Sequence, residues 1–375
     1  MTEKIAQAIE VVDRLHKNAG GVVLGKSAQI KLVLSALICS GHVLFEDVPG
    51  TAKTMLARSL AASIEGAVSN RVQCTPDLQP TDITGLSVWD PERRQFEFQP
   101  GPVFTNVLVV DEVNRALPKA QSALLEGMAE RQVTVDGVTH PLPQPFLLIA
   151  TENPIEQEGT FPLPKAQLDR FLIRTSLGYP TLDEELSIVD AQLHGHPLES
   201  LRPVVGLADL AVVFEAVEDV YIDPLLKRWA VELVRATRSL DAVEVGASVR
   251  GSLALERVAR GWALVNGRDF VVADDIEQLF EPVAAHRLVL APEVLMEEGE
   301  PDAFRRVFEA CLERAPRPEP NWRRRRQPRA HEHPGRAPVS SRPEPALRRS
   351  AVRHPAQPAA GTGRRGRGHQ AIPSG

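Results

Sequence analysis

The chain has 375 residues, 43% of them hydrophobic and 25% charged, and a formal net charge of −6 at pH 7. This composition is ordinary for folded domains and excludes a fibrous or wholly disordered protein, while the length suits two domains. No apolar run approaches the roughly 20 residues that cross a bilayer, the start does not resemble a secretory signal, and three scattered cysteines predict reduced thiols in a cytoplasmic protein.

The first predicted elements are helical. Apolar residues recur at helical spacing from Ile5 to Val12, and a second helix is predicted over Gln29–Ile38. The glycine-rich segment Gly20–Gly25 lies between them. We expect this segment to line an adenine pocket.

A candidate phosphate-binding loop follows the apolar strand Val43–Phe45 and precedes a predicted helix that begins at Lys53. Phosphate binding needs inward-pointing backbone N–H groups, a lysine for the β- and γ-phosphates, and a hydroxyl for Mg²⁺. The strict pattern G-x-x-x-x-G-K-[ST] fails twice, at Asp47 and Ala52, so an ordinary strand–turn–helix stays open as the alternative. The candidate nucleotide-binding residues are Asp47, Val48, Pro49, Gly50, Thr51, Ala52, Lys53 and Thr54.

Two β-hairpins are predicted further along the chain. The first pairs Ile83–Val88 with Phe96–Gln99 around a turn-rich stretch. The second pairs Gln132–Val135 with Val138–His140 around the turn signal Asp-Gly. They are either insertions that touch a client protein or simple exposed turns.

Between the hairpins, the buried strand Val107–Val110 ends directly in Asp111 and Glu112. Ligands of open α/β sheets bind at the carboxyl ends of the strands. We therefore expect Asp111 to hold Mg²⁺ through water, together with Thr54, and Glu112 to orient or deprotonate an attacking water. The alternative is an acidic turn after a strand.

A third strand, Phe146–Ala150, runs into Thr151-Glu152-Asn153-Pro154. The amide of Asn153 would then lie beside the acidic strand, where it can hold the attacking water and sense the γ-phosphate. Together these strands predict a doubly wound, mainly parallel α/β core.

With these motifs in place, the chain resembles the MoxR family of AAA+ ATPases over about residues 1–315. The resemblance rests on Glu46–Thr54, Gly101–Phe104, Val109–Ala116, Ala150–Phe171 and Gly246–Gly251.

The resemblance implies a role for each matching residue. Lys53 and Thr54 would be the Walker A pair, and Asp111 and Glu112 the Walker B pair, binding ATP and Mg²⁺. The remaining assignments are Asn153 as sensor 1, Arg170 as the arginine finger offered to a neighbouring subunit, and Arg250 as sensor 2, placed over the nucleotide by a closing lid.

Some assignments stay open. Arg115 and Arg174 are nearby alternatives for the arginine finger. The chain also departs from the family pattern at three positions. Ala52 replaces a frequent glycine, Lys165 a frequent glutamate and Val249 a frequent proline.

Three regions are expected: an AAA+ core over 1–180, an all-helical lid over 181–315 and a disordered tail over 316–375. The lid prediction rests on helical periodicity in five segments, namely Leu182–Leu193, Leu207–Val217, Pro224–Leu240, Val249–Asn266 and Ala273–Leu290.

The tail has a distinct composition. It holds 14 Arg and 11 Pro with only three Glu and no Asp or Lys, so its net charge is +11 and the remainder of the chain carries −17. Such a segment cannot bury enough apolar surface to fold. Arg323–Arg326 is open to a solvated role, to an acidic partner or nucleic acid, or to the ring's own acidic surface. A shifted reading frame is a further alternative.

The family resemblance implies a hexameric ring that couples ATP hydrolysis to remodelling or maturation of a protein client. Such maturation includes metal-cofactor insertion, often with partners that bear von Willebrand factor A domains. Two alternatives stay open. One is a nucleic-acid motor, which the basic tail favours and the acidic remainder opposes. The other is a nucleotide-regulated scaffold with little turnover.

Overall fold

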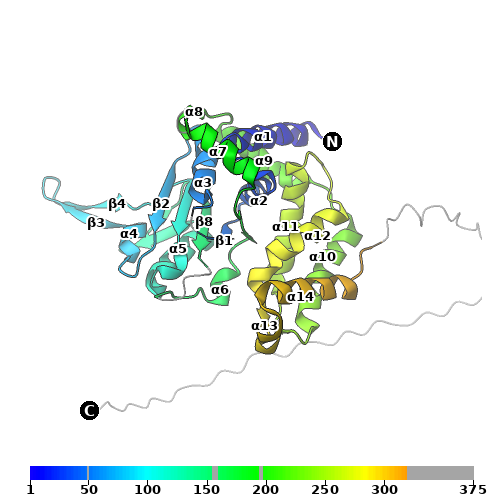
Figure 1. Ribbon diagram of the computed structural model, residues 1–375. Coiled ribbons are helices and arrows are strands. Elements are labelled where there is room, and N and C mark those ends of the chain that lie inside the picture. Colours follow the sequence, from blue (N-terminus) through cyan, green and yellow to red (C-terminus); the bar gives the residue numbers. More distant parts are fainter. Residues whose placement is uncertain (49, 154–158, 194–196, 319–375) are drawn as a thin grey trace, which may run out of the picture. The chain divides into compact units, whose positions relative to one another are not determined.

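The computed structural model describes residues 1–48, 50–153, 159–193 and 197–318 (Figure 1). A five-stranded sheet forms the core, and all of its strand pairs are parallel. In spatial order its strands are β2 (Ser69–Gln73), β5 (Val107–Asp111), β8 (Leu147–Glu152), β1 (Val43–Glu46) and β9 (Ile173–Thr175). The order is not sequential, so the connections cross over and helices cover both faces. This confirms the predicted doubly wound core.

Side chains of the central strands alternate between two apolar clusters. On β5, Val107 and Val109 join one cluster, while Leu108 and Val110 join the other. All four are at most 1% exposed. The first cluster is completed by α1 (Glu3–Gly20), α2 (Ser27–Ile38) and α3 (Lys53–Ala62), and the second by α4 (Pro80–Thr84) and α5 (Pro118–Glu130). Each fully buried side chain of this size stabilises the fold by about 1.5–3 kcal/mol.

Both predicted hairpins form. The first consists of β3 (Gly85–Asp90) and β4 (Gln95–Pro100), and the second of β6 (Gln132–Val135) and β7 (Val138–Pro141). The first strand was predicted two residues too early at both ends, because Ile83 and Thr84 belong to α4 and the strand continues to Asp90. Ile83 is fully buried in the second cluster, and burial of this side chain outweighs its strand propensity.

The chain beyond residue 181 is mainly helical. The cluster that contains α1 and α2 continues into α9 and α11, so a single apolar core joins the sheet's helices to the later ones. The elements of this part are α7 (Leu182–Leu193), α8 (Pro197–Ser200), α9 (Leu207–Asp219), α10 (Pro224–Ala236), β10 (Val243–Val245), α11 (Val249–Val265), α12 (Ala273–Ala284), β11 (Val289–Leu290), α13 (Pro292–Glu298) and α14 (Glu300–Arg314). Short α6 (Lys165–Leu168) precedes β9, and the 3₁₀ turns are η1 (Val113–Arg115), η2 (Thr237–Ser239) and η3 (Ala285–Arg287).

Two predicted lid helices were too long. The helix expected to reach Leu240 ends at Ala236 and gives way to η2. The helix expected to reach Leu290 ends at Ala284, and the next three residues form the 3₁₀ turn η3. There, the imidazole Nε2 of His286 lies 3.0 Å from the carbonyl oxygen of Phe171, and Arg287 donates to the same oxygen at 2.6 Å. The helix end is therefore set by contacts with the core.

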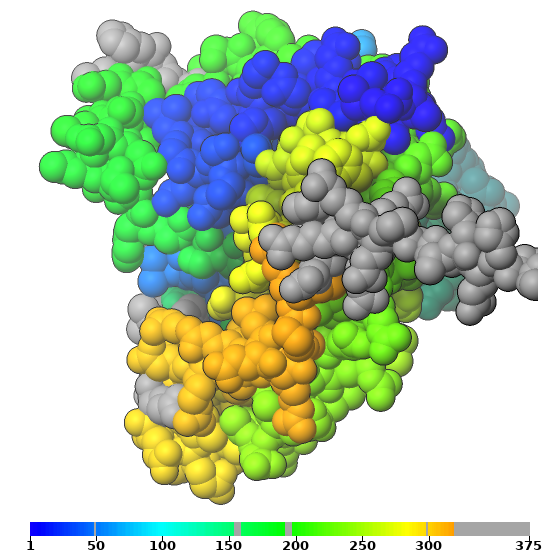
Figure 2. Space-filling view, turned by 90° about the vertical axis from the view of Figure 1, so that its right-hand side faces the viewer, coloured from blue at the N-terminus to red at the C-terminus, as the bar shows by residue number. Residues whose placement is uncertain are grey.

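Figure 2 shows the C-terminal helices in orange, beside the yellow-green segment that includes α10. The indole N–H of Trp229 on α10 donates to the carbonyl of Ala315 at 2.7 Å, which fixes the end of α14. The predicted tail is described only as far as Pro318, and Arg323–Arg326 lie outside the described residues. Among the residues that are described, none of the helices combines the length and apolarity that a membrane crossing requires.

Candidate active site

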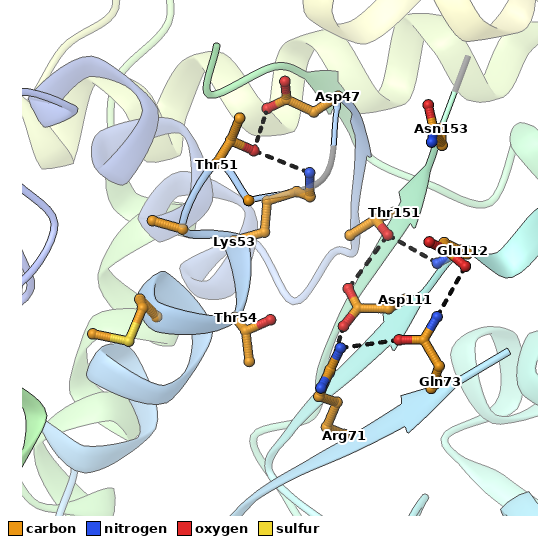
Figure 3. Close-up of a pocket in the computed structure, with 13 residues that line it drawn as sticks. Asp47, Thr51, Lys53, Thr54, Arg71, Gln73, Asp111, Glu112, Thr151 and Asn153 are labelled. Atoms are coloured by element: carbon orange, nitrogen blue, oxygen red, sulfur yellow. Dashed lines mark hydrogen bonds and ion pairs between the residues drawn. The ribbon is translucent and has the colours of Figure 1, made fainter. Parts of the chain in front are cut away.

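A cavity of about 320 Å³ opens at the carboxyl ends of the parallel strands (Figure 3). It brings together residues from the loop after β1, from α3, and from β2, β5 and β8 or directly after them, which are far apart in the sequence. The lining residues are Asp47, Gly50, Thr51, Ala52, Lys53, Thr54, Met55, Arg71, Gln73, Asp111, Glu112, Thr151 and Asn153.

Asp47 organises the loop after β1. Its Oδ2 accepts hydrogen bonds from the Thr51 hydroxyl at 3.0 Å and from the backbone N–H groups of Leu177 and Gly178 at 2.8 and 3.2 Å. Its Oδ1 accepts from the N–H of Val48 at 3.1 Å. The carboxylate thus holds the loop closed and ties it to the segment after β9.

Lys53 is the first residue of α3 and is only 8% exposed. Its ammonium donates to the carbonyl of Val48 at 2.7 Å and to the hydroxyl of Thr51 at 3.0 Å. Burial lowers the pKa of Lys53 from its usual value, although the negative charges of Asp47, Asp111 and Glu112 oppose this shift. A desolvated cation at this place gains strongly from an anionic ligand.

The backbone around Lys53 suits an anion. Gly50 and Ala52 both have positive φ, at +87° and +65°, which curls the chain into α3. The N-terminus of α3 has no side-chain cap, and the lining of the cavity includes Thr54 and Met55 of its first turn. Uncapped N–H groups at a helix start bind anions. Pro49, also predicted in this loop, lies outside the described residues.

The two predicted carboxylates lie across the cavity from the loop (Figure 3). Asp111 ends β5 and is 8% exposed. Thr151 joins the pair, since its hydroxyl donates to Asp111 Oδ1 at 3.3 Å and accepts from the N–H of Glu112 at 2.9 Å. Glu112 adopts the left-handed conformation with φ +56°, and this turns its side chain out of the strand direction.

Four residues that line this cavity were not predicted as site residues, namely Met55, Arg71, Gln73 and Thr151. Arg71 and Gln73 come from the edge strand β2, which was not predicted. The Arg71 Nε lies 2.6 Å from Asp111 Oδ2, and the Gln73 amide donates to Glu112 Oε2 at 3.0 Å. Only Val72 is buried in this strand, so no apolar alternation marks it. The one available signal is that two polar residues with strand spacing share a face.

The remaining predicted residues divide into two groups. Asn153 is 6% exposed and lines the cavity with Lys53. Arg170 and Arg250 are not among the described residues that line it. The Arg170 guanidinium donates to the carbonyl of Leu125 at 2.6 Å, and that of Arg250 lies 3.7 Å from Asp169.

Asp169 links the core to the helical part. Besides Arg250, it accepts from Arg287 Nε at 2.9 Å and from the Ser248 hydroxyl at 3.1 Å. Arg287 is nearly buried, and burial lowers its pKa to about 10 even though Asp169 favours the charged form. Asp169, the residue before Arg170, is therefore held in place by side chains of the helical lid.

The alternative arginines have partners within the chain. Arg115 lies 3.1 Å from Glu112 Oε2, next to the cavity. Arg174 lies 2.7 Å from Glu46 Oε1, and its guanidinium is 5.3 Å from the ring centre of Phe304.

A second cavity of about 260 Å³ adjoins the loop, and it is mostly apolar. It shares Gly50, Thr51, Ala52 and Met55 with the first. Its other lining residues are Gly21, Val22, Val23, Leu24, Lys26, Gly178, Pro180, Ile188, Ala191 and Pro197. The segment predicted to line an adenine pocket thus lies where an apolar ring bound beside the phosphate loop would sit.

These residues fit a nucleotide and a divalent cation. The buried ammonium and the uncapped helix start suit phosphate, while the Asp111 carboxylate and Thr54 hydroxyl are the oxygen donors that Mg²⁺ prefers.

Comparison with known proteins agrees with this arrangement. The family model described as "ATPase family associated with various cellular activities (AAA)" matches residues 42–173, and the "AAA lid domain" model matches residues 235–307. The chain is 39% identical to "Chaperone MoxR1" of Mycobacterium tuberculosis over 309 residues, which cover 80% of this chain and 81% of that protein. The chain belongs to the MoxR family of AAA+ ATPases.

The chain is also similar to a further sequence and to a solved structure. The protein YeaC of Bacillus subtilis is 45% identical over 308 residues, covering 82% of this chain and 94% of YeaC. A crystal structure from Cytophaga hutchinsonii, 36% identical, superimposes with a TM-score of 0.76 and covers 83% of this chain and 96% of that one. Nucleotide binding and ATPase activity are thereby assigned at the level of the family.

The structure shows the conformation and the contacts of the three residues that depart from the MoxR pattern. Ala52 adopts the left-handed conformation that glycine adopts freely. The Lys165 ammonium donates to the carbonyl of Leu288 at 2.8 Å, and burial lowers its pKa. Val249 opens α11 with its side chain 66% exposed.

Proposed function

We propose that this chain hydrolyses ATP to ADP and phosphate in the 320 Å³ cavity and uses the reaction to remodel or mature a protein client. One observation carries the proposal. Lys53 and the carboxylates Asp111 and Glu112, from distant parts of the chain, line the same cavity at the carboxyl edge of the sheet. A triphosphate needs this combination of cation and metal-binding carboxylate in one place.

Each residue has a defined task in this proposal. Lys53 and the first N–H groups of α3 bind the β- and γ-phosphates, and Thr54 and Asp111 hold Mg²⁺. When bound, Mg²⁺ neutralises phosphate charge and orients the transferred group. Glu112 takes the proton of the attacking water, and Asn153 holds that water in line.

The base of ATP belongs in the adjoining apolar cavity. Val22, Val23 and Leu24, together with Ile188 of α7, provide apolar parts of its lining. The shared loop residues join this cavity to the phosphate site, so one nucleotide spans both.

The test compares two variants with the wild type. Lys53→Ala should lose nucleotide binding, whereas Glu112→Gln should keep binding and lose hydrolysis by about 10²–10⁴-fold, which is the usual contribution of general acid–base catalysis. Phosphate release and binding of a fluorescent ATP analogue separate the two effects. Glu309→Gln, which changes an exposed α14 carboxylate outside the cavity lining, is the charge-matched control. Unchanged hydrolysis in both site variants would refute the assignment.

We further propose that a neighbouring subunit completes the site. Arg170 lines a separate hollow with Ser122, Glu126 and Glu130 and is not among the described residues that line the phosphate cavity of its own chain. Arg115 and Arg174 are engaged by acidic residues of their own chain, which favours Arg170 as the finger supplied in trans. A fixed arginine at the γ-phosphate is worth about 10³–10⁵ in rate. A hexameric ring is the assembly we propose.

Mixing variants tests this arrangement. Arg170→Ala retains its own nucleotide site, and Lys53→Ala retains its finger, so each should be inactive alone. Mixed rings should recover part of the activity, because an intact finger then faces an intact site. No recovery in rings shown to be mixed by mass would contradict a finger in trans.

The client is proposed to contact the hairpin β3–β4. Trp89 and Phe96 are directly opposite in this hairpin and are 49% and 70% exposed. Their rings meet edge to face, with centres 5.3 Å apart, so they form one apolar surface. The proposed maturation includes metal-cofactor insertion, with a von Willebrand factor A-domain protein as partner.

Client capture tests this last step. The Glu112→Gln protein with ATP should retain client that the same protein with Trp89→Ala and Phe96→Ala loses. Retention unaffected by the hairpin changes would place the client elsewhere. A cytoplasmic location remains a prediction of the sequence, as does the expectation that the chain does not bind nucleic acid except through its basic tail.

A further inference from the structure

The carboxylate proposed to hold Mg²⁺ already has a cationic partner. Arg71 Nε lies 2.6 Å from Asp111 Oδ2, while the other carboxylate oxygen accepts from Thr151. The Asp111 side chain is 12% exposed and that of Arg71 is 55% exposed. The guanidinium therefore reaches from the rim of the cavity to an almost buried anion.

The contact continues to the second carboxylate. The Arg71 NH2 group donates to Gln73 Oε1 at 2.9 Å, and the Gln73 amide donates to Glu112 Oε2 at 3.0 Å (Figure 3). Gln73 is the strand partner of Asp111 in the parallel pairing of β2 with β5. The edge strand thus places a cation and an amide on the two carboxylates of the acidic pair.

Lys53 does not donate a hydrogen bond to either carboxylate of the acidic pair. Its ammonium donates to Val48 and Thr51 on the loop side of the cavity. Among the described residues, Arg71 is consequently the cation in direct contact with Asp111, and its charge opposes the binding of a divalent cation at the same carboxylate.

We propose that Arg71 is a positioning residue that competes with the divalent cation for Asp111, so that it sets the metal concentration at which the nucleotide site loads. The inference rests on the proposed function. When the metal–nucleotide complex binds, the guanidinium leaves Asp111, and the exposed side chain of Arg71 can move aside without unpacking the core. Its removal should strengthen metal binding, which is the opposite of what loss of a ligand or a structural residue does.

The experiment uses the full chain with Mn²⁺ and a non-hydrolysable ATP analogue, and electron paramagnetic resonance measures free Mn²⁺. Arg71→Met should lower the free Mn²⁺ concentration at half-saturation about three- to tenfold. Arg93→Met is the control. It also removes one arginine from an exposed ion pair, but on the turn of β3–β4. It should leave the value unchanged. Thermal unfolding of both variants confirms that the fold is retained.

The outcomes are distinguishable. An unchanged or higher half-saturation value for Arg71→Met overturns the inference while the proposed function stands. An equal fall in Arg93→Met also overturns it, because net charge would then explain the effect. If the wild-type chain binds no Mn²⁺ with the nucleotide analogue, the proposed function itself fails and the inference fails with it.

Discussion

Replacing Ala52 by glycine should stabilise the protein, although alanine-to-glycine changes usually destabilise. Ala52 has φ +65° and ψ +18° at the start of α3. An L-residue in this left-handed conformation costs about 1–2 kcal/mol relative to its right-handed form. Glycine does not incur this cost. It does give the unfolded chain more conformational entropy, which lowers the free energy of unfolding by about 0.4–1 kcal/mol. Because Ala52 is exposed, its methyl group contributes no core packing. We therefore expect a net gain of about 0.5–1 kcal/mol.

Urea denaturation followed by circular dichroism measures this gain as a shift of the midpoint at constant slope. Ala211→Gly is the matched control. Ala211 is exposed in the interior of α9, so the same chemical change should cost about 1 kcal/mol there. The two variants should differ in sign as well as in size.

The reasoning fails if Ala52→Gly destabilises the protein as much as Ala211→Gly does. Such a result would mean that residue 52 is not left-handed in the folded protein. A gain in stability accompanied by unchanged ATP hydrolysis would show that the strain is not required for catalysis.

Three further changes test charges buried in the fold. His42 is buried, its Nε2 donates to the carbonyl of Met128, and burial lowers its pKa to about 4. As the pH falls below 6.5, the unfolded chain therefore takes up a proton at His42 before the folded chain does. The free energy of unfolding should fall by about 3 kcal/mol between pH 6.5 and 4. His42→Gln should flatten this part of the pH–stability curve measured by urea denaturation. Burial and the nearby Glu46 raise the pKa of Glu152 to about 7. The contribution of Glu152 to the free energy of unfolding therefore falls as the pH rises from 4.5 to 7. Glu152→Gln should raise the free energy of unfolding by about 1–3 kcal/mol at pH 8 and change it little at pH 4.5. Arg287→Met leaves the carboxylate of Asp169 without its closest cation and should cost about 2–4 kcal/mol by the same assay.

The elements that the sequence predicts well are those whose signals are contiguous. The loop between β1 and α3 and the carboxylates after β5 each consist of neighbouring residues, so strand, turn and function can be read together. Helix α7 was predicted with its observed bounds because its apolar and acidic residues repeat over three turns.

What escaped prediction depends on contacts between distant residues. β2 contains one buried side chain, and it becomes a strand because β5 offers it a parallel partner. Arg71 reaches the site only through that pairing. The end of α12 is likewise set by hydrogen bonds of η3 to Phe171, which is more than 100 positions earlier in the chain.

Asp47 and Ala52, which stand where the strict phosphate-loop pattern has glycine, are accommodated for different physical reasons. Position 52 has positive φ, so its alanine is tolerated at a cost in strain. Position 47 is not among the described residues with positive φ, and glycine is not required there. Instead, Asp47 binds Leu177 and Gly178, and Gly178 lines the apolar cavity beside the loop. The carboxylate therefore joins the phosphate loop to the wall of the base pocket, a link that glycine cannot make. For this reason Asp47→Gly, which restores the general pattern at this position, should weaken nucleotide binding in this chain.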